Sequence, residues 1–176
     1  MVPRPAYLRY YTSMLQHRFI DSALRNPDKI AFIDRSLGSN VSYSRALLAS
    51  LILARRFKKL ERGRIGVMLP TSSAGGLAVI AALMADRTPV MINYSTGAEK
   101  NCLYAQEQCD FRVIVTAKAL LEKIGCKKLP NMVLIEDILG TLGKLEKALA
   151  FVKSNLPISL LKRAVGKSNP DSPAVI

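Results

Sequence analysis

Residues 65–93 read IGVMLPTSSAGGLAVIAALMADRTPVMIN, and this stretch decides the fold. It opens with a short apolar run that is rich in β-forming residues, 65–69, which ends at PTSS. The small and apolar residues 74–85 suit a buried helix, and a second apolar run follows at 89–93. A strand, a helix and a strand in this order form a βαβ unit, which implies a parallel sheet covered by helices on its faces.

A membrane span is the alternative interpretation of the same stretch. Residues 65–85 carry no charged side chain, and their length is about that of a bilayer-crossing helix. The turn formers of 70–73 lie in the middle, however, and the Gly75-Gly76 pair follows directly. In lipid these residues would leave backbone groups unpaired at high cost, so the sequence favours a buried sheet.

The rest of the chain continues the alternation of strands and helices. Before the central unit the sequence predicts a helix over residues 14–24, a hairpin of strands 29–34 and 41–43 around a turn at 37–40, and a helix over 44–60. After it the sequence predicts a helix over 96–109, a strand at 111–115, a helix at 117–124, a strand at 132–135 and a helical pattern from 136 onward. Ser13 with Gln16, and Thr96 with Glu99, have the spacing of capping boxes. The predicted fold class is therefore α/β, with a doubly wound, mostly parallel sheet, flanking helices and a small N-terminal hairpin.

The net charge of +13 is large for a chain of 176 residues. Basic side chains gather at 55–64 and again at 144–167. An excess of this kind favours anionic partners, and a solvated basic surface is the alternative. The apolar and basic segment 158–163 fits either a helix packed on the sheet or a helix lying on an anionic membrane surface. Nucleic acid is not an expected partner, because the aromatic residues do not interleave with the basic clusters.

Few residues are available for catalysis. His17 is the only histidine, which excludes a nucleophilic triad and, with three scattered cysteines, a closed metal site. The cysteines show no CxxC spacing, and Cys102 and Cys109 fall on one face of a helix, as core thiols do. The N-terminus has no apolar segment typical of a secretory signal. We therefore expect a reducing, cytoplasmic location, with peripheral association with the inner face of the membrane as a further expectation, and we assign no catalytic residue.

Two loops are the candidates for contact with a ligand. The loop 69–76 joins a strand to a helix, as phosphate-binding loops do, but it lacks the lysine of such a loop. The segment 94–100 is interpreted as a helix cap, with a ligand-facing loop as the alternative. Open α/β sheets bind ligands at the carboxyl ends of their strands. The candidate residues for the substrate cleft are therefore Thr71, Ser72, Asn93 and Thr96.

Several segments, taken in order, resemble the opening portion of the AMP-binding, adenylate-forming acyl ligases: NPDKIA at 26–31, VSYS at 41–44, GVMLP at 66–70 and PVMIN at 89–93. The residues 89–98 and 113–116 look most like the ligase part of the acyl-ACP synthetase/2-acylglycerophosphoethanolamine acyltransferase enzymes. The resemblance runs from about residue 19 to 176. It depends on the ordered set rather than on any single motif.

The resemblance implies an enzyme that activates a fatty acid with ATP and Mg²⁺ and passes the acyl group to CoA or to acyl carrier protein, in fatty acid and phospholipid metabolism. In that family a segment like 171–176 runs into the phosphate loop, and this chain stops before it. The expectation is that residues 1–176 are the N-terminal portion of the ligase domain, inactive alone, forming part of one wall of the acyl and nucleotide cleft. The alternative is a non-enzymatic basic α/β module that docks on anionic lipid or on an acidic carrier protein.

Overall fold

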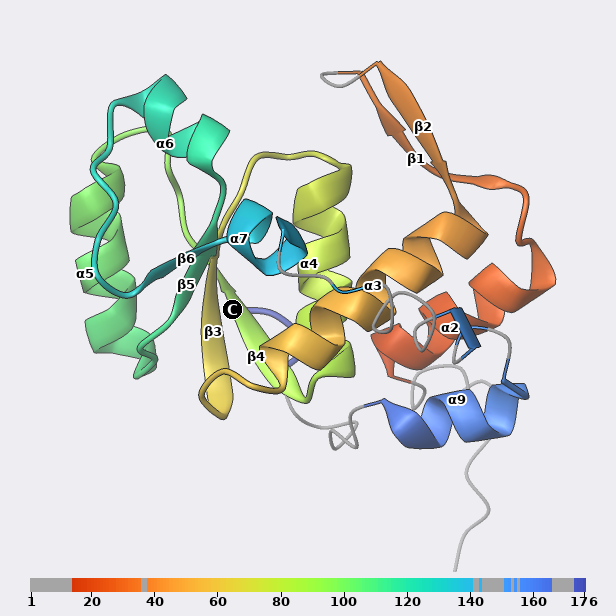
Figure 1. Cartoon of the computed structure of the whole chain (residues 1–176). Helices are drawn as coiled ribbons and strands as arrows, with labels where there is room; N and C mark the ends of the chain where they lie inside the picture. Colours follow the sequence, from red (N-terminus) through yellow and green to blue (C-terminus); the bar gives the residue numbers. More distant parts are fainter. Residues whose placement is uncertain are drawn as a thin grey trace, which may run out of the picture.

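The computed structural model describes residues 14–35, 38–140, 143, 151–152, 154, 156–165 and 173–176. A parallel sheet with the strand order β4-β3-β5-β6 forms its centre (Figure 1). The strands are β3 (Gly63–Met68), β4 (Arg87–Met91), β5 (Ile114–Thr116) and β6 (Met132–Leu134). The central βαβ unit is as predicted: β3, then α4 (Ser73–Met84), then β4 beside β3 in parallel.

The sheet is doubly wound, which confirms the predicted fold class. From β4 the chain passes through α5 (Ala98–Cys109) to β5 on the other side of β3, and α6 (Lys118–Ile124) then leads to β6. Because successive strands are added first on one side of β3 and then on the other, the strand order reverses between β3 and β5. In open α/β sheets the crevice outside such a reversal is where ligands bind.

Side chains alternate across β3 and build two cores. Ile65 and Val67 belong to a core with α2 (Leu15–Arg25), α3 (Tyr43–Phe57), α4, α7 (Ile135–Gly140) and α9 (Ile158–Ala164). Met68 points to the other face and packs in a core with α5 and α6. Gly66 lies on that face too, and a Cβ there would stand 2.6 Å from the ring of Phe111. Both faces of the sheet are thus covered, as the near-continuous apolar strands require.

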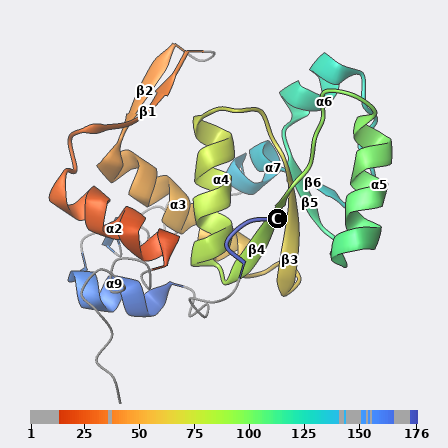
Figure 2. The same ribbon diagram turned by 180° about the vertical axis from the view of Figure 1, so that it is seen from behind.

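The predicted N-terminal hairpin is present. Strands β1 (Ile30–Asp34) and β2 (Ser39–Ser42) pair antiparallel and project from the helical layer beside α4 (Figures 1 and 2). The hairpin leads directly into α3, whose N-cap Ser42 accepts a hydrogen bond from the backbone N–H of Arg45. This arrangement brings the end of β1 to the first turn of α4.

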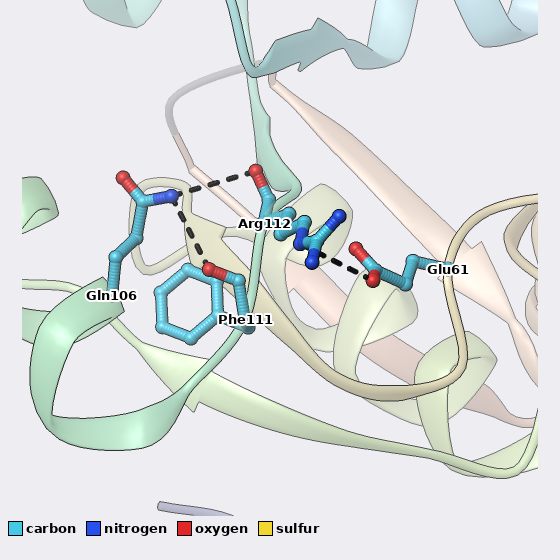
Figure 3. A network of polar contacts seen from close by, with 4 residues as sticks. All are labelled: Glu61, Gln106, Phe111 and Arg112. Atoms are coloured by element: carbon cyan, nitrogen blue, oxygen red, sulfur yellow. Dashed lines mark hydrogen bonds and ion pairs between the residues drawn. The ribbon is translucent and has the colours of Figure 1, made fainter.

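Polar contacts link the loops at the edge of the sheet where β3 and β5 begin. Figure 3 shows Arg112 beside Glu61, with 3.5 Å between Nε and Oε1, and the Gln106 amide donating to the carbonyls of Phe111 and Arg112. At the start of β4, the guanidinium of Arg87 donates to the carbonyls of Leu60, Glu61, Ala85 and Asp86. These contacts give the loop carbonyls hydrogen-bond donors within the chain, so the side chains at this edge of the sheet stabilise the fold.

The C-terminal residues continue the sheet. The backbone N–H of Met91 donates to the carbonyl of Ile176 over 2.8 Å, and the N–H of Ile176 donates to the carbonyl of Pro89 over 3.0 Å. This is the hydrogen-bond pattern of parallel strands, so Ile176 extends the sheet beside β4. The part of the predicted helical pattern between residues 141 and 155 lies mostly outside the described residues.

Three local predictions need correction. The capping box of Thr96 and Glu99 does not form: the N-cap of α5 is Gly97, at φ 64°, because the Asn101 amide binds the carbonyls of Asn93 and Thr96 and sets the turn. The N-cap of α2 is Met14, while Ser13 lies outside the described residues. The helix at 158–163 packs on α2 rather than on the sheet. Within the described helices none is long and apolar enough to cross a bilayer, so the span alternative has no support there.

Candidate functional site

A cleft of about 850 Å³ lies between the β1-β2 hairpin and the loop that joins β3 to α4. Its walls are mostly apolar side chains, with the hydroxyls of the loop at one side; the lining residues include Phe32, Ile33, Leu69, Val79 and Met91. Ile33 is 72% exposed and Met91 46% exposed, so the apolar wall is open to solvent. Because the loop follows the carboxyl end of β3, the cleft lies at the edge where open α/β sheets bind ligands.

Asp34 occupies the N-terminus of α4. Its Oδ2 accepts a hydrogen bond from the Ser73 backbone N–H at 2.9 Å and another from the Ser73 hydroxyl at 2.7 Å. Asp34 and Ser73 are buried, at 4% and 7% exposure. A carboxylate at this position is stabilised by the helix dipole and satisfies an otherwise orphaned backbone donor. The same position is therefore unsuitable for a phosphate, which would meet a buried negative charge.

The predicted site residues fall into two groups. Thr71 and Ser72 both line the cleft. Thr71 is exposed, whereas Ser72 is the N-cap of α4 and its hydroxyl accepts a hydrogen bond from the Gly75 N–H over 3.3 Å. Thr71 thus offers a hydroxyl to the cleft, while Ser72 also has a structural role.

Asn93 and Thr96 lie in the neighbouring loop, between β4 and α5, and neither lines the cleft. Asn93 Oδ1 accepts hydrogen bonds from the N–H and the hydroxyl of Ser95, so this side chain shapes its own turn. Thr96 is exposed. The sheet brings the two loops to the same edge, because β3 and β4 are paired in parallel, but only the first loop contributes to the cleft.

Sequence reasoning missed the contribution of the hairpin. Ile33 and Asp34 reach the cleft from β1, 39 positions before the Ser73 that Asp34 contacts. The available signal was a single carboxylate at the end of an apolar strand, and no periodicity links such a residue to a distant helix. The contact exists only because the hairpin folds over the start of α4.

The described residues do not offer the ligand set of a metal ion. They include no group of three or more His, Cys, Asp or Glu side chains that could hold a metal. The N-terminus of α4, which follows the candidate loop 69–76, is filled by Asp34. We therefore derive no step through Mg²⁺ from this part of the chain.

Cys102 and His17, a potential nucleophile and a potential base, are not activated for catalysis. Cys102 is fully buried, and burial raises the pKa of its thiol to about 11, so the thiolate is disfavoured. Burial, followed by the charge of Lys162, lowers the pKa of His17 from 6.5. His17 lies in α2, which contributes no residue to the cleft lining, and its Nε2 atom has no hydrogen-bond partner among the described residues. Neither group gives this part of the chain an independent reaction.

Residues 19–176 match the family model described as AMP-binding enzyme. Since the match covers most of the chain, this protein belongs to the AMP-binding enzyme family. Together with the parallel sheet and its flanking helices, this identifies the α/β unit as the N-terminal subdomain fold of adenylate-forming ligases.

Solved structures of such enzymes share this fold at low sequence identity. The nonribosomal peptide synthetase FmoA3 (S1046A) superposes with a TM-score of 0.70 at 16% identity, over 93% of this chain and 16% of its own. The Klebsiella oxytoca NpsA N-terminal subdomain, in complex with 3-hydroxybenzoyl-AMSN, gives 0.62 at 14% identity, over 81% and 35%. O-succinylbenzoate coenzyme A synthetase (MenE) from Bacillus subtilis, in complex with ATP and magnesium ion, gives 0.59 at 15% identity, over 72% and 34%. The chain thus spans 16% to 35% of these three chains.

Proposed function

We propose that this chain is the N-terminal part of an ATP-dependent fatty acyl ligase of the acyl-ACP synthetase type. Membership of the AMP-binding family over residues 19–176 is the observation that carries the proposal. The choice of a fatty acid as substrate is supported by residues 89–98 and 113–116, which resemble the acyl-ACP synthetase/2-acylglycerophosphoethanolamine acyltransferase enzymes. The non-enzymatic docking module has no support of its own from the family match.

The proposed reaction has two steps. A carboxylate oxygen of the fatty acid attacks the α-phosphorus of ATP, and the bond to pyrophosphate breaks, which gives an acyl-adenylate. A thiol of CoA or of acyl carrier protein then loses its proton and attacks the acyl carbon, and AMP leaves with the bonding electrons. Stabilising the charge at phosphorus requires donors aimed at the reacting oxygens. We assign those donors, together with the sites for ATP and Mg²⁺, to parts of the enzyme other than the residues described here.

The part played by this subdomain is one wall of the substrate cleft. Thr71 and Ser72 stand at the carboxyl edge of the sheet, on the cleft that also touches Met91. Asn93 and Thr96 remain proposed contributors through the adjacent loop. Because the hydroxyl of Ser72 also caps α4, alanine at this position would mix a stability effect with a binding effect. Thr71→Ala is therefore the cleaner probe of the cleft.

The proposal is tested by ATP–pyrophosphate exchange. We expect the purified 176-residue polypeptide to catalyse no exchange with any straight-chain fatty acid. The longest product of the same coding sequence is expected to catalyse exchange that depends on a fatty acid and not on amino acids or aryl acids. Exchange by the 176-residue chain alone would refute its assignment as an inactive portion. Exchange that depends only on amino acids or aryl acids would refute the fatty acid as the substrate class.

The location and the thiol partner complete the proposal. The proposed location is the reducing cytoplasm that the cysteine pattern of the sequence predicts. CoA and acyl carrier protein are distinguished by offering each thiol to the pre-formed acyl-adenylate and following thioester formation by mass spectrometry. We expect the carrier protein to be the better acceptor of the acyl group. A preference for CoA would instead classify the enzyme as an acyl-CoA synthetase.

A further inference from the structure

The β1-β2 hairpin is attached to α4 at two points. Because side chains alternate along a strand, Phe32 and Asp34 of β1 point to the same face of the hairpin. Asp34 accepts two hydrogen bonds from Ser73, and the ring of Phe32 lies against Gly76. Ser73 and Gly76 are three residues apart, so they share one face of the helix. One face of β1 thus lies on one face of α4.

Gly76 allows the ring of Phe32 to approach the helix closely. A Cβ at position 76 would lie 2.7 Å from Cε1 and 3.2 Å from Cζ of Phe32. Carbon atoms that are not bonded do not come this close, so any larger residue at position 76 would push the ring away from α4. Phe32 and Gly76 both line the cleft. The position of the ring therefore sets how much of the cleft is open beside α4.

Apolar side chains from three elements face the same space. Val79, three residues after Gly76, continues that face of α4 and also lines the cleft. Ile33 of β1 and Met91 of β4 line it too, and 72% and 46% of their surfaces are exposed. A ligand that covers these side chains would remove apolar surface from water, which favours binding. The cleft is thus suited to a hydrocarbon group.

The charged and polar residues of the cleft do not favour an anionic headgroup. The buried carboxylate of Asp34 already accepts the hydrogen bond of the Ser73 backbone N–H, and a second anion beside it would be repelled. The hydroxyl of Ser72 caps α4. Among the described residues that line the cleft, Arg35 is the only cation, and it is exposed. For an amphipathic acid, the cleft therefore suits the hydrocarbon tail rather than the carboxylate.

We propose that the tail of the fatty acid lies in the cleft between the hairpin and α4, and that Phe32 and Gly76 determine which chain lengths the ligase accepts. The inference rests on the proposed function for the identity of the substrate. Neither side chain carries a polar group, so the pair acts through the space that it leaves and not through the chemistry of activation. Each methylene that gains or loses apolar contact changes affinity by roughly fourfold. A small displacement of the ring is therefore sufficient to change the preferred chain length.

Chain-length profiles test this proposal. The longest product of the coding sequence would be assayed by hydroxamate formation, with kcat/KM measured for straight-chain acids from hexanoate to stearate. In Gly76→Ala we expect kcat/KM for the longest acids to fall about tenfold relative to the shortest, because about two methylenes lose contact at roughly fourfold each. Phe32→Leu should shift the preference toward longer acids. The double variant should return toward the wild-type profile, because the smaller leucine leaves room for the added Cβ.

Two substitutions outside the cleft serve as matched controls. Gly140→Ala adds a Cβ to another helical glycine, where no atom lies within 4 Å of it. Phe151→Leu shortens an aromatic side chain that is 61% exposed and does not line the cleft. Both are expected to keep the wild-type profile. The proposal is overturned if Gly76→Ala and Phe32→Leu also keep it, or if the controls change it as much as they do.

Photolabelling locates the tail without relying on turnover. A fatty acid with a diazirine at its methyl end would be irradiated with the same protein, with and without excess palmitate. We expect label that palmitate suppresses on the tryptic peptides 30–35 and 65–87, which contain Phe32 and Val79. Suppressible label confined to other peptides, or no suppressible label at all, overturns the proposal. A wild type that forms no hydroxamate with any fatty acid would refute the proposed function instead, and the labelled peptides would still decide where the tail lies.

Discussion

Replacing Asp34 by alanine should destabilise the fold by about 3 kcal/mol. The carboxylate makes two short hydrogen bonds to Ser73, and both residues are buried. A hydrogen bond to a charged group contributes about 1.5–3 kcal/mol, and an unpaired buried donor adds a desolvation penalty. We take the lower end of the sum, because the adjoining cleft admits water to the vacated donors. Asp34→Asn keeps an acceptor oxygen but loses the charge, so it should cost about half as much.

Urea unfolding of the 176-residue chain, followed by circular dichroism, measures this effect, with the slope m expected to stay constant. Amide hydrogen exchange at Ser73 should quicken in Asp34→Ala, because its acceptor is gone. Asp28→Asn, an exposed position in the turn before β1, is the matched control and should change stability by under about 0.5 kcal/mol. A loss below about 1 kcal/mol for Asp34→Ala, or equal losses for the alanine and asparagine variants, would show that the carboxylate does not hold the hairpin on α4.

Three further predictions, one of them with a matched control substitution, test other parts of the fold. Arg87→Met leaves four loop carbonyls without their donor and should lower the free energy of unfolding in urea by about 3 kcal/mol. The control Arg112→Met removes an ion pair whose arginine is 84% exposed and should cost under about 0.5 kcal/mol. Equal losses would contradict the structural role of Arg87. Gly75→Ala drives a Cβ into the Pro70 carbonyl oxygen and should cost about 2 kcal/mol by the same measurement, so a neutral result would contradict the close approach. Because folding lowers the pKa of His17 below 6.5, the stability that neutral His17 contributes is fully present above pH 6.5 and declines below it. The melting temperature should therefore fall less on acidification in His17→Gln than in the wild type. Identical pH profiles of the two proteins would exclude His17 as the cause.

The sequence was sufficient to predict the described helices and strands, because each of them buries one face and its apolar residues therefore repeat with the period of a helix or a strand. The run at 65–69 and the alternation of apolar strands with helices gave the sheet, and β3, α4 and β4 lie where they were predicted within about two residues. The strand predicted at 111–115 instead occupies Ile114–Thr116. Residues 111–113 form a loop before this strand, because the Gln106 amide donates hydrogen bonds to the carbonyls of Phe111 and Arg112. The periodicity of the sequence gives no signal for such a contact.

The site was less predictable because its parts meet only in the folded chain. The rule that ligands bind at the carboxyl ends of strands selected Thr71 and Ser72, which do line a cleft. It equally selected Asn93 and Thr96, which are not among the residues that line this cleft, and the Asn93 side chain instead accepts hydrogen bonds from Ser95. The helix N-terminus that resembled an anion site from the sequence is filled by Asp34, which comes from a separate hairpin.

The most direct test of the central claim, that this subdomain serves a fatty acyl adenylating enzyme, is the product trapped by hydroxylamine. The longest product of the coding sequence would be incubated with ATP, Mg²⁺ and straight-chain fatty acids, as wild type and as Thr71→Ala, with Thr88→Ala in the first half of β4 as control. We predict fatty acyl hydroxamate with equal amounts of AMP and pyrophosphate, and a raised KM for fatty acid or ATP in Thr71→Ala alone. Release of ADP and phosphate, or the absence of any fatty acyl hydroxamate, would contradict the claim.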